Sequence, residues 1–237
     1  MIDRERITWL VLFSIAMGFL ETSVVVYLRE LYYPEGFDFP LQVMDMNVAV
    51  VELLREASTI IMLAGIGYFT GRTFSVRFAS FIACFAIWDI FYYVFLKLLL
   101  DWPESLFTWD ILFLIPSPWI GPVLAPCLVS LTMLLLAAVI YWRDHQGATT
   151  RIQWIEWLIL AVGSVVIVAS WTIDYLQYHS GLNKMGNDPM YAFASYVPDD
   201  YNWWVFALGE IILIVAIIRF WRRTGNQINT AGTSSAA

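Results

Sequence analysis

Six long apolar segments limit what this chain can fold into. They cover residues 7–28, 48–70, 75–99, 111–142, 152–177 and 203–221. Each is long enough to cross a bilayer core of about 30 Å, which takes roughly 20 helical residues. At 60% hydrophobic and 14% charged residues, the chain lacks the polar surface that a soluble domain of this size needs. The sequence therefore predicts an all-α polytopic membrane protein, a six-transmembrane-helix bundle.

The basic residues predict how these spans are oriented. Nine of the thirteen Lys and Arg residues lie at the N-terminus, in the second and fourth loops and at the C-terminus. Cytoplasmic segments of membrane proteins are enriched in Lys and Arg, so we expect both termini in the cytoplasm and the three acidic loops outside. This bias is typical of a bacterial inner membrane, which is the expected location. A cleaved signal peptide is an alternative for 7–28, although its apolar part exceeds the usual length of about 7–15 residues.

The sequence also predicts one domain and one irregular span. Residues 1–223 form a single transmembrane domain in this interpretation, and residues 224–237 form a disordered cytoplasmic tail, because they are small and polar without periodicity. Prolines interrupt the fourth segment at positions 116, 118, 122 and 126, and a proline disrupts a helix by removing an amide hydrogen and clashing with the preceding turn. We expect a short outer segment ending near Leu114, a break, and a kinked helix from Trp119 to Trp142.

Four of the expected spans place a carboxylate at a similar depth. A helix rises about 1.5 Å per residue, which puts Glu21, Glu56 and Glu210 roughly 10–12 Å below the outer boundary. Asp89 lies at the same depth or slightly deeper. Shallower charges lie within about one turn of the outer boundary, and the long side chain of Lys97 can extend its ammonium group to that boundary. These shallower acids are Glu52, Asp110 and Asp174.

The spacing of these residues predicts that they face one chamber. Glu52, Glu56 and Thr59 share a helix face with Arg55 beside them, and Asp89, Tyr93 and Lys97 share another. A charged side chain at the centre of a lipid-facing helix costs about 2.5–3.5 kcal/mol, so an inward-facing polar chamber open to the outside is favoured. The residues expected to bind a ligand or protons there are Glu21, Glu52, Arg55, Glu56, Asp89, Tyr93, Lys97, Asp110 and Glu210.

Three functions fit this pattern. Acids outnumber bases in the expected chamber, which suits protons or a cationic or protonatable small molecule or lipid head group, bound by a receptor or a small carrier. A second possibility is a lipid head-group enzyme in which Glu56 and Asp89 hold Mg²⁺, Mn²⁺ or Ca²⁺, hard ions that prefer oxygen ligands. The third is a non-catalytic subunit or assembly factor, or a homo-oligomer, in which the same charges join helices or contact a partner.

Other chemistries are disfavoured. The only two histidines, His145 and His179, fall on opposite sides of the membrane in the expected topology. A bis-histidine haem site is therefore not expected. Nucleic-acid binding needs a basic patch, whereas the formal net charge is −7. The sequence carries no glycine-rich phosphate loop, so an ATP-driven motor is not encoded.

Overall fold

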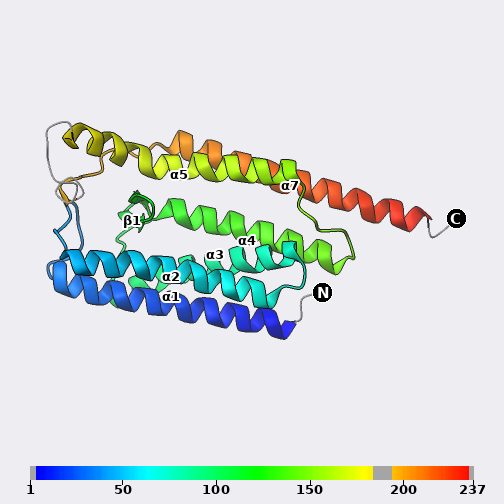
Figure 1. The fold of residues 1–237 in the computed structure, drawn as a ribbon, viewed down its shortest axis with the longest axis horizontal. Helices are drawn as coiled ribbons and strands as arrows, with labels where there is room; N and C mark the ends of the chain where they lie inside the picture. The colour runs from blue at the N-terminus through cyan, green and yellow to red at the C-terminus, as the bar shows by residue number, and fades with distance from the viewer. Residues whose placement is uncertain (1–3, 184–193, 235–237) are drawn as a thin grey trace.

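Long helices lying side by side make up most of the molecule (Figure 1). The computed structural model describes residues 4–183 and 194–234. The elements run, in chain order, α1 (Arg4–Tyr32), α2 (Met46–Thr70), α3 (Phe74–Leu100), β1 (Trp109–Phe113), β2 (Trp119–Pro122), α4 (Leu124–His145), α5 (Trp154–Asn183) and α7 (Trp203–Ser234).

Five of the described helices, α1, α3, α4, α5 and α7, are long and apolar enough to cross a membrane. This indicates a multi-pass membrane protein. The segment predicted as a span at 48–70 is helical as α2, but it does not reach the same apolar content. Its first half carries Glu52, Arg55 and Glu56, which explains the difference. Crossing by α2 therefore stays a prediction.

The helices form two groups. α3 packs extensively against α1, α2 and α4, whereas α5 packs mainly against α7. The α5–α7 pair meets the first group through α4 and β2. Glycines allow close approach inside both groups: a Cβ at Gly18 of α1 would lie 3.0 Å from the Trp88 carbonyl oxygen of α3, and one at Gly209 of α7 would lie 2.6 Å from Ile167 Cγ1 of α5. Small residues at such contacts are typical of helix packing in membranes.

The proline-rich region forms a β-hairpin, which the sequence analysis did not foresee. β1 and β2 pair antiparallel, with Trp109 opposite Pro122 and Asp110 opposite Gly121. The predicted start of the fourth helix at Trp119 is therefore wrong, because α4 begins at Leu124. The physical reason is that the prolines between the strands prevent helical hydrogen bonding, and the flanking extended segments pair their backbone groups with each other.

The C-terminal helix also extends further than predicted. α7 continues to Ser234, so the expected disordered tail from residue 224 is corrected for residues 224–234; residues 235–237 lie outside the described part. Thr224 is fully buried and its hydroxyl donates to the Phe220 carbonyl at 2.8 Å. Arg143 of α4 stacks on Trp221 at 3.6 Å from the ring centre. These contacts hold the start of the polar stretch against the bundle, where the helix can continue.

Both ends of the described chain lie toward one end of the bundle (Figure 1), and arginine side chains make contacts there. Arg6 Nη1 donates to the Thr70 carbonyl at 3.3 Å, and Arg223 Nη2 donates to the Arg151 carbonyl at 2.9 Å. Arg223 also pairs with Glu156 at 2.8 Å. We call this the basic end and the opposite one the acidic end. The grouping matches the predicted sorting of loops, while the direction of the bundle in a membrane stays a prediction.

Candidate functional site

A cavity of about 500 Å³ lies toward the acidic end, between α1, α2, α3, the segment 33–44 and the β-hairpin. Its walls bring together seven of the predicted site residues: Glu21, Glu52, Arg55, Glu56, Asp89, Tyr93 and Asp110. Five of these are carboxylates supplied by four elements. We call this cavity the carboxylate chamber.

Arg55 joins two of the carboxylates. Its Nε and Nη2 atoms each lie 2.8 Å from Glu52 Oε2, one turn earlier in α2. Its Nη1 atom pairs with Glu21 Oε1 of α1, and the Thr59 hydroxyl donates to the other Glu21 oxygen at 3.5 Å. One guanidinium group therefore serves two carboxylates, and it fixes α2 against α1.

Glu56 connects α2 to the β-hairpin. Its Oε2 atom accepts a hydrogen bond from the Leu114 backbone amide at 2.9 Å, just beyond β1. Glu56 is buried. Within 4–183 and 194–234, its Oε1 atom has no hydrogen-bond partner and the side chain has no ion pair. This carboxylate keeps one oxygen available to the chamber.

Asp89 and Asp110 bind hydroxyl groups. Asp89 Oδ2 accepts from Ser130 of α4 at 2.8 Å, and Asp110 Oδ2 accepts from Tyr93 of α3 at 3.1 Å. Asp110 is only 3% exposed, and it lines the same cavity as Asp89. Neither carboxylate has an ion pair in the described part of the chain.

Arg29 is a chamber residue that the sequence analysis missed. It is 8% exposed, and its guanidinium group lies 3.8 Å from the centre of the Trp102 ring and 4.6 Å from that of Phe37. The signal was available, because Glu21, Val25 and Arg29 recur every four residues and so share one face of α1.

Lys97, although predicted for the chamber, lies outside it. Its ammonium group binds Asp101 Oδ1 at 2.7 Å and the Pro103 carbonyl at 3.1 Å, and its side chain is 50% exposed. This hydrogen bond and the lysine charge lower the pKa of Asp101. Lysines near a helix C-terminus commonly bind the last carbonyl groups in this way. Helical spacing placed Lys97 on the right face, but the end of α3 offered closer partners.

Glu210 also lies elsewhere, although its predicted depth suggested the chamber. It lines a separate cavity between α4 and α7, where Oε2 accepts from the Thr132 hydroxyl at 2.7 Å. Asp174 of α5, one of the shallower acids, accepts a hydrogen bond from the Tyr196 hydroxyl. Both belong to the α5–α7 group, which meets the rest of the molecule mainly through α4. The depth that Glu210 shares with Glu21 and Glu56 therefore did not bring it into the chamber.

The chamber wall combines acid with aromatic surface. Against five carboxylates the described lining supplies two guanidinium groups, Arg29 and Arg55. The aromatic lining consists of Tyr32, Tyr33, Phe37, Trp88, Tyr92, Tyr93 and Phe113. In the segment after α1, the Tyr33 hydroxyl accepts from the Gln42 amide at 2.9 Å, and burial raises the pKa of Tyr33. It therefore stays neutral and adds no further negative charge.

The arrangement does not form a metal cluster within residues 4–183 and 194–234. No group of three or more His, Cys, Asp or Glu side chains there is placed to hold a metal ion. Glu56 and Asp89, the pair expected to bind Mg²⁺, Mn²⁺ or Ca²⁺, accept hydrogen bonds from the Leu114 amide and the Ser130 hydroxyl, and metal binding by this pair stays a prediction. What the chamber offers is a set of separated acceptors beside aromatic rings.

Comparison with known proteins assigns no family to this chain. No protein-family model matches it, no curated protein matches it, and no solved structure matches it.

Proposed function

We propose that this is a bacterial inner-membrane protein whose carboxylate chamber opens outward and binds a cationic or protonatable small molecule or lipid head group. Basic residues at one end of the bundle support an orientation with both termini in the cytoplasm. The chamber lies toward the other end. In this orientation a ligand reaches it from the outside.

The single observation that carries the proposal is the excess of acid around one cavity. Five carboxylates face two guanidinium groups, and Arg55 is already shared between Glu21 and Glu52. Buried carboxylates close to like charges are unfavourable unless they bind protons or a cation. A bound cation would therefore stabilise the ionised form of Glu56, Asp89 and Asp110.

The size and the aromatic lining define the kind of cation. A volume of about 500 Å³ falls within the range of about 300–1,000 Å³ that is usual for small-molecule sites. Cations are attracted to the faces of aromatic rings, and Arg29 already uses Trp102 and Phe37 in this way. An organic amine with an apolar body matches this surface better than a small hydrated ion does.

A carrier function is one form of this proposal. Glu56, Asp89 and Asp110 would exchange protons for the cation, so that binding of one releases the other. Uptake of a labelled amine into proteoliposomes, driven by an imposed pH gradient, tests this form separately from binding. Binding without uptake would leave a receptor or a binding subunit of a larger complex.

The direct test of binding uses a matched pair of probes. Phenethylamine carries a charged amine, and 2-phenylethanol has the same ring and chain without the charge. Calorimetric titration of the purified protein should detect phenethylamine only, because the acid excess selects for charge. Glu56→Gln should weaken binding at least about tenfold, since hydrogen bonds to charged groups contribute about 1.5–3 kcal/mol.

The control variant is Glu30→Gln on the exposed surface of α1 at the same end of the bundle. It removes one negative charge without touching the chamber, and it should leave affinity unchanged. Equal loss in both variants would mean that overall charge, and not the chamber, attracts the amine. Equal binding of both probes to the native protein would contradict the proposal.

Native mass spectrometry of gently purified protein separates the remaining alternatives. A small cation or lipid bound to the monomer agrees with the proposal. A stoichiometric divalent ion would instead support the metal-dependent lipid enzyme. A second polypeptide, or a second copy of this chain, would support the subunit or homo-oligomer.

A further inference from the structure

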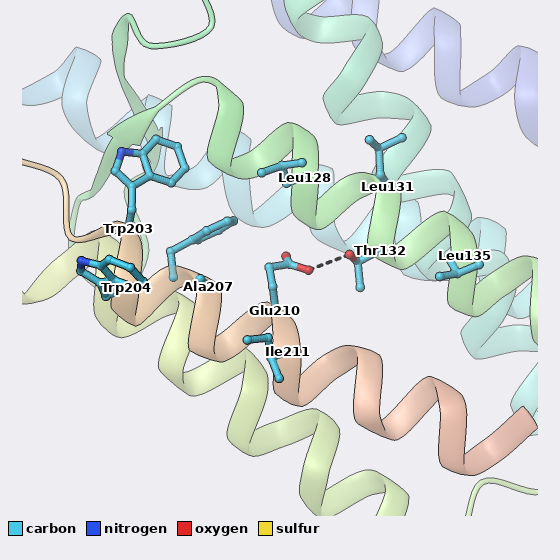
Figure 2. Close-up of a pocket in the computed structure, with 10 residues that line it drawn as sticks. Leu128, Leu131, Thr132, Leu135, Trp203, Trp204, Ala207, Glu210 and Ile211 are labelled. Carbon is cyan, nitrogen blue, oxygen red and sulfur yellow. Dashed lines mark hydrogen bonds between the residues drawn. The ribbon is translucent and has the colours of Figure 1, made fainter.

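A second cavity of about 600 Å³ lies between α4 and α7 and is independent of the chamber. Figure 2 shows Leu128, Leu131 and Leu135 of α4 along one side and Ile211 of α7 along the other. Trp203 and Trp204, at the start of α7, lie at one end of it. We call this cavity the Glu210 groove.

One carboxylate oxygen in the groove lacks a partner. Glu210 Oε2 accepts from the Thr132 hydroxyl at 2.7 Å, as the dashed line in Figure 2 marks. Glu210 Oε1 is buried, and it has no hydrogen-bond partner among the residues that the structure describes. Buried polar atoms in folded proteins are nearly always paired. An unpaired carboxylate oxygen among leucines therefore points to a hydrogen-bond donor that comes from outside the chain.

The walls of the groove indicate where that donor comes from. Leu131, Ile211 and Trp204 are exposed, Trp204 by 87%, and they belong to helices long and apolar enough to cross a membrane. In a bilayer, such side chains face lipid tails. The groove is thus open to molecules dissolved in the membrane, and tryptophan at its end is typical of the lipid–water interface.

α4 separates this groove from the chamber. Ser130 directs its hydroxyl to Asp89 on the chamber side, whereas Thr132 directs its hydroxyl to Glu210. Residues two positions apart on a helix point in nearly opposite directions, about 200° apart at 3.6 residues per turn. The two hydroxyls therefore serve different sites, and a ligand in the groove does not share the chamber's acids.

We propose that the Glu210 groove binds a membrane-dissolved molecule with an apolar chain and one hydrogen-bond-donating group, a hydroxyl or a protonated amine. The donor binds Glu210 Oε1, and the chain lies against Leu128, Leu131, Leu135 and Ile211. A volume of about 600 Å³ fits a lipid-sized chain. A single acceptor needs a single donor, in contrast to the several acids of the chamber.

The test uses three photoreactive probes of equal length: dodecylamine, dodecanol and dodecane, each with a diazirine on the chain. They are incorporated with the purified protein into phosphatidylcholine bilayers, cross-linked by light and mapped by peptide mass spectrometry. Dodecylamine and dodecanol should label residues 128–135 and 203–211 at least about five times more than dodecane does. Equal labelling of residues 128–135 and 203–211 by all three probes, or no labelling of these segments by dodecylamine and dodecanol, would overturn the proposal.

Two substitutions complete the test. Glu210→Leu should reduce labelling by dodecylamine and dodecanol to the level of dodecane, while Glu56→Gln in the chamber should leave it unchanged. Glu210→Gln keeps size and an acceptor oxygen, so it should reduce labelling by the amine more than by the alcohol. This second variant decides the matter if Glu210→Leu does not fold. Unchanged labelling of Glu210→Gln and Glu210→Leu by the amine would contradict the assignment.

Failure here and failure of the proposed function can be told apart. Glu56→Gln changes only the chamber and should weaken phenethylamine binding, whereas Glu210→Leu and Glu210→Gln change only the groove and should reduce labelling of residues 128–135 and 203–211. Capture of a partner protein that blocks labelling of 203–211 would show that the groove holds a neighbouring helix, and it would overturn the small-molecule proposal alone.

Discussion

The carboxylate chamber and the Glu210 groove lie on opposite sides of α4, and they surround their carboxylates with different kinds of side chain. Four elements contribute five carboxylates to the chamber, together with two guanidinium groups and aromatic rings. The groove has one carboxylate among apolar side chains. The number of acids around a cavity, and not their depth alone, therefore decides what the cavity can bind. Many acids require compensating positive charge, whereas one acid requires only one donor.

The two sites also differ in how their walls are joined. Ion pairs and hydrogen bonds link α1 to α2, α2 to the hairpin, and α3 to both β1 and α4 around the chamber. One hydrogen bond, between Thr132 and Glu210, joins α4 to α7 across the groove. Substitutions that remove a charge should therefore affect the chamber more than the groove, and substitutions that change helix packing should affect the groove more than the chamber.

The largest effect is expected for Arg55→Leu. It leaves Glu21 and Glu52 buried without the cation that both share, and breaking a buried ion pair costs about 3–5 kcal/mol. The melting temperature in detergent, measured by circular dichroism, should fall by many degrees. The triple variant Glu21→Leu, Glu52→Leu, Arg55→Leu removes every charge of this cluster and should recover much of the loss. A melting temperature equal to that of the native protein in the single variant would contradict the assigned pairing.

A second prediction concerns packing at the groove. Gly209→Ala places a methyl group 2.6 Å from Ile167 Cγ1. Because this distance is too short, α7 must shift against α5, and overpacking of this kind costs about 1–3 kcal/mol of stability. Thermal denaturation should show this loss, and dodecylamine labelling of the groove should fall while phenethylamine binding persists. Gly181→Ala is the matched control, because a Cβ there meets nothing within 4 Å. Similar losses in both variants would rule out the close α5–α7 contact as the cause.

Removing a positive charge from the chamber should strengthen the binding of a cation there. Arg29→Gln raises the acid excess that we hold responsible for cation binding. Two unit charges about 10 Å apart interact by roughly 1.7 kcal/mol at an effective dielectric constant of about 20. Phenethylamine should therefore bind several times more tightly at low salt, as measured by calorimetry, and the gain should shrink as salt is added. Weaker binding would show that the cation uses the surface around Trp102 that Arg29 organises.

The smallest effect is expected for Lys97→Gln. Lys97 lies outside the chamber, so phenethylamine affinity should stay the same. The variant loses only the interaction that lowers the pKa of Asp101. A lowered pKa in the folded state contributes stability above the ordinary value of about 3.9, and this contribution is lost as the pH falls through the folded value. A small decrease in melting temperature at pH 7 should disappear in acid; a change in amine affinity would return Lys97 to the site.

The helices and much of the chamber could be predicted from sequence because both follow from one-dimensional patterns. Apolar length locates α1, α3, α4, α5 and α7, and helical spacing aligns Glu52, Glu56 and Arg55 on one face. Depth along a helix follows from a fixed rise per residue. These quantities need no knowledge of which helix is the neighbour.

What could not be predicted depends on rotation and pairing. Glu210 shares the depth of Glu21, but α7 turns it toward α4 and Thr132. Lys97 shares a face with Tyr93, but its long side chain reaches back to Asp101 and Pro103. The prolines predicted a break in the fourth helical segment. The pairing of 109–113 with 119–122, however, is a contact between two segments that neither segment alone encodes.

In the proposed orientation, acids from separate helices surround one chamber that is open to the outside. Single cysteines at positions 56, 110 and 210, made in a Cys84→Ala, Cys127→Ala background, test this arrangement. The variants are assayed in sealed right-side-out vesicles with membrane-impermeant thiol reagents. A cationic reagent added outside should label Glu56→Cys and Asp110→Cys faster than an anionic reagent of similar size does, and neither reagent should label Glu210→Cys. Equal rates for the two reagents, or labelling only when they are added from the cytoplasmic side, would contradict it.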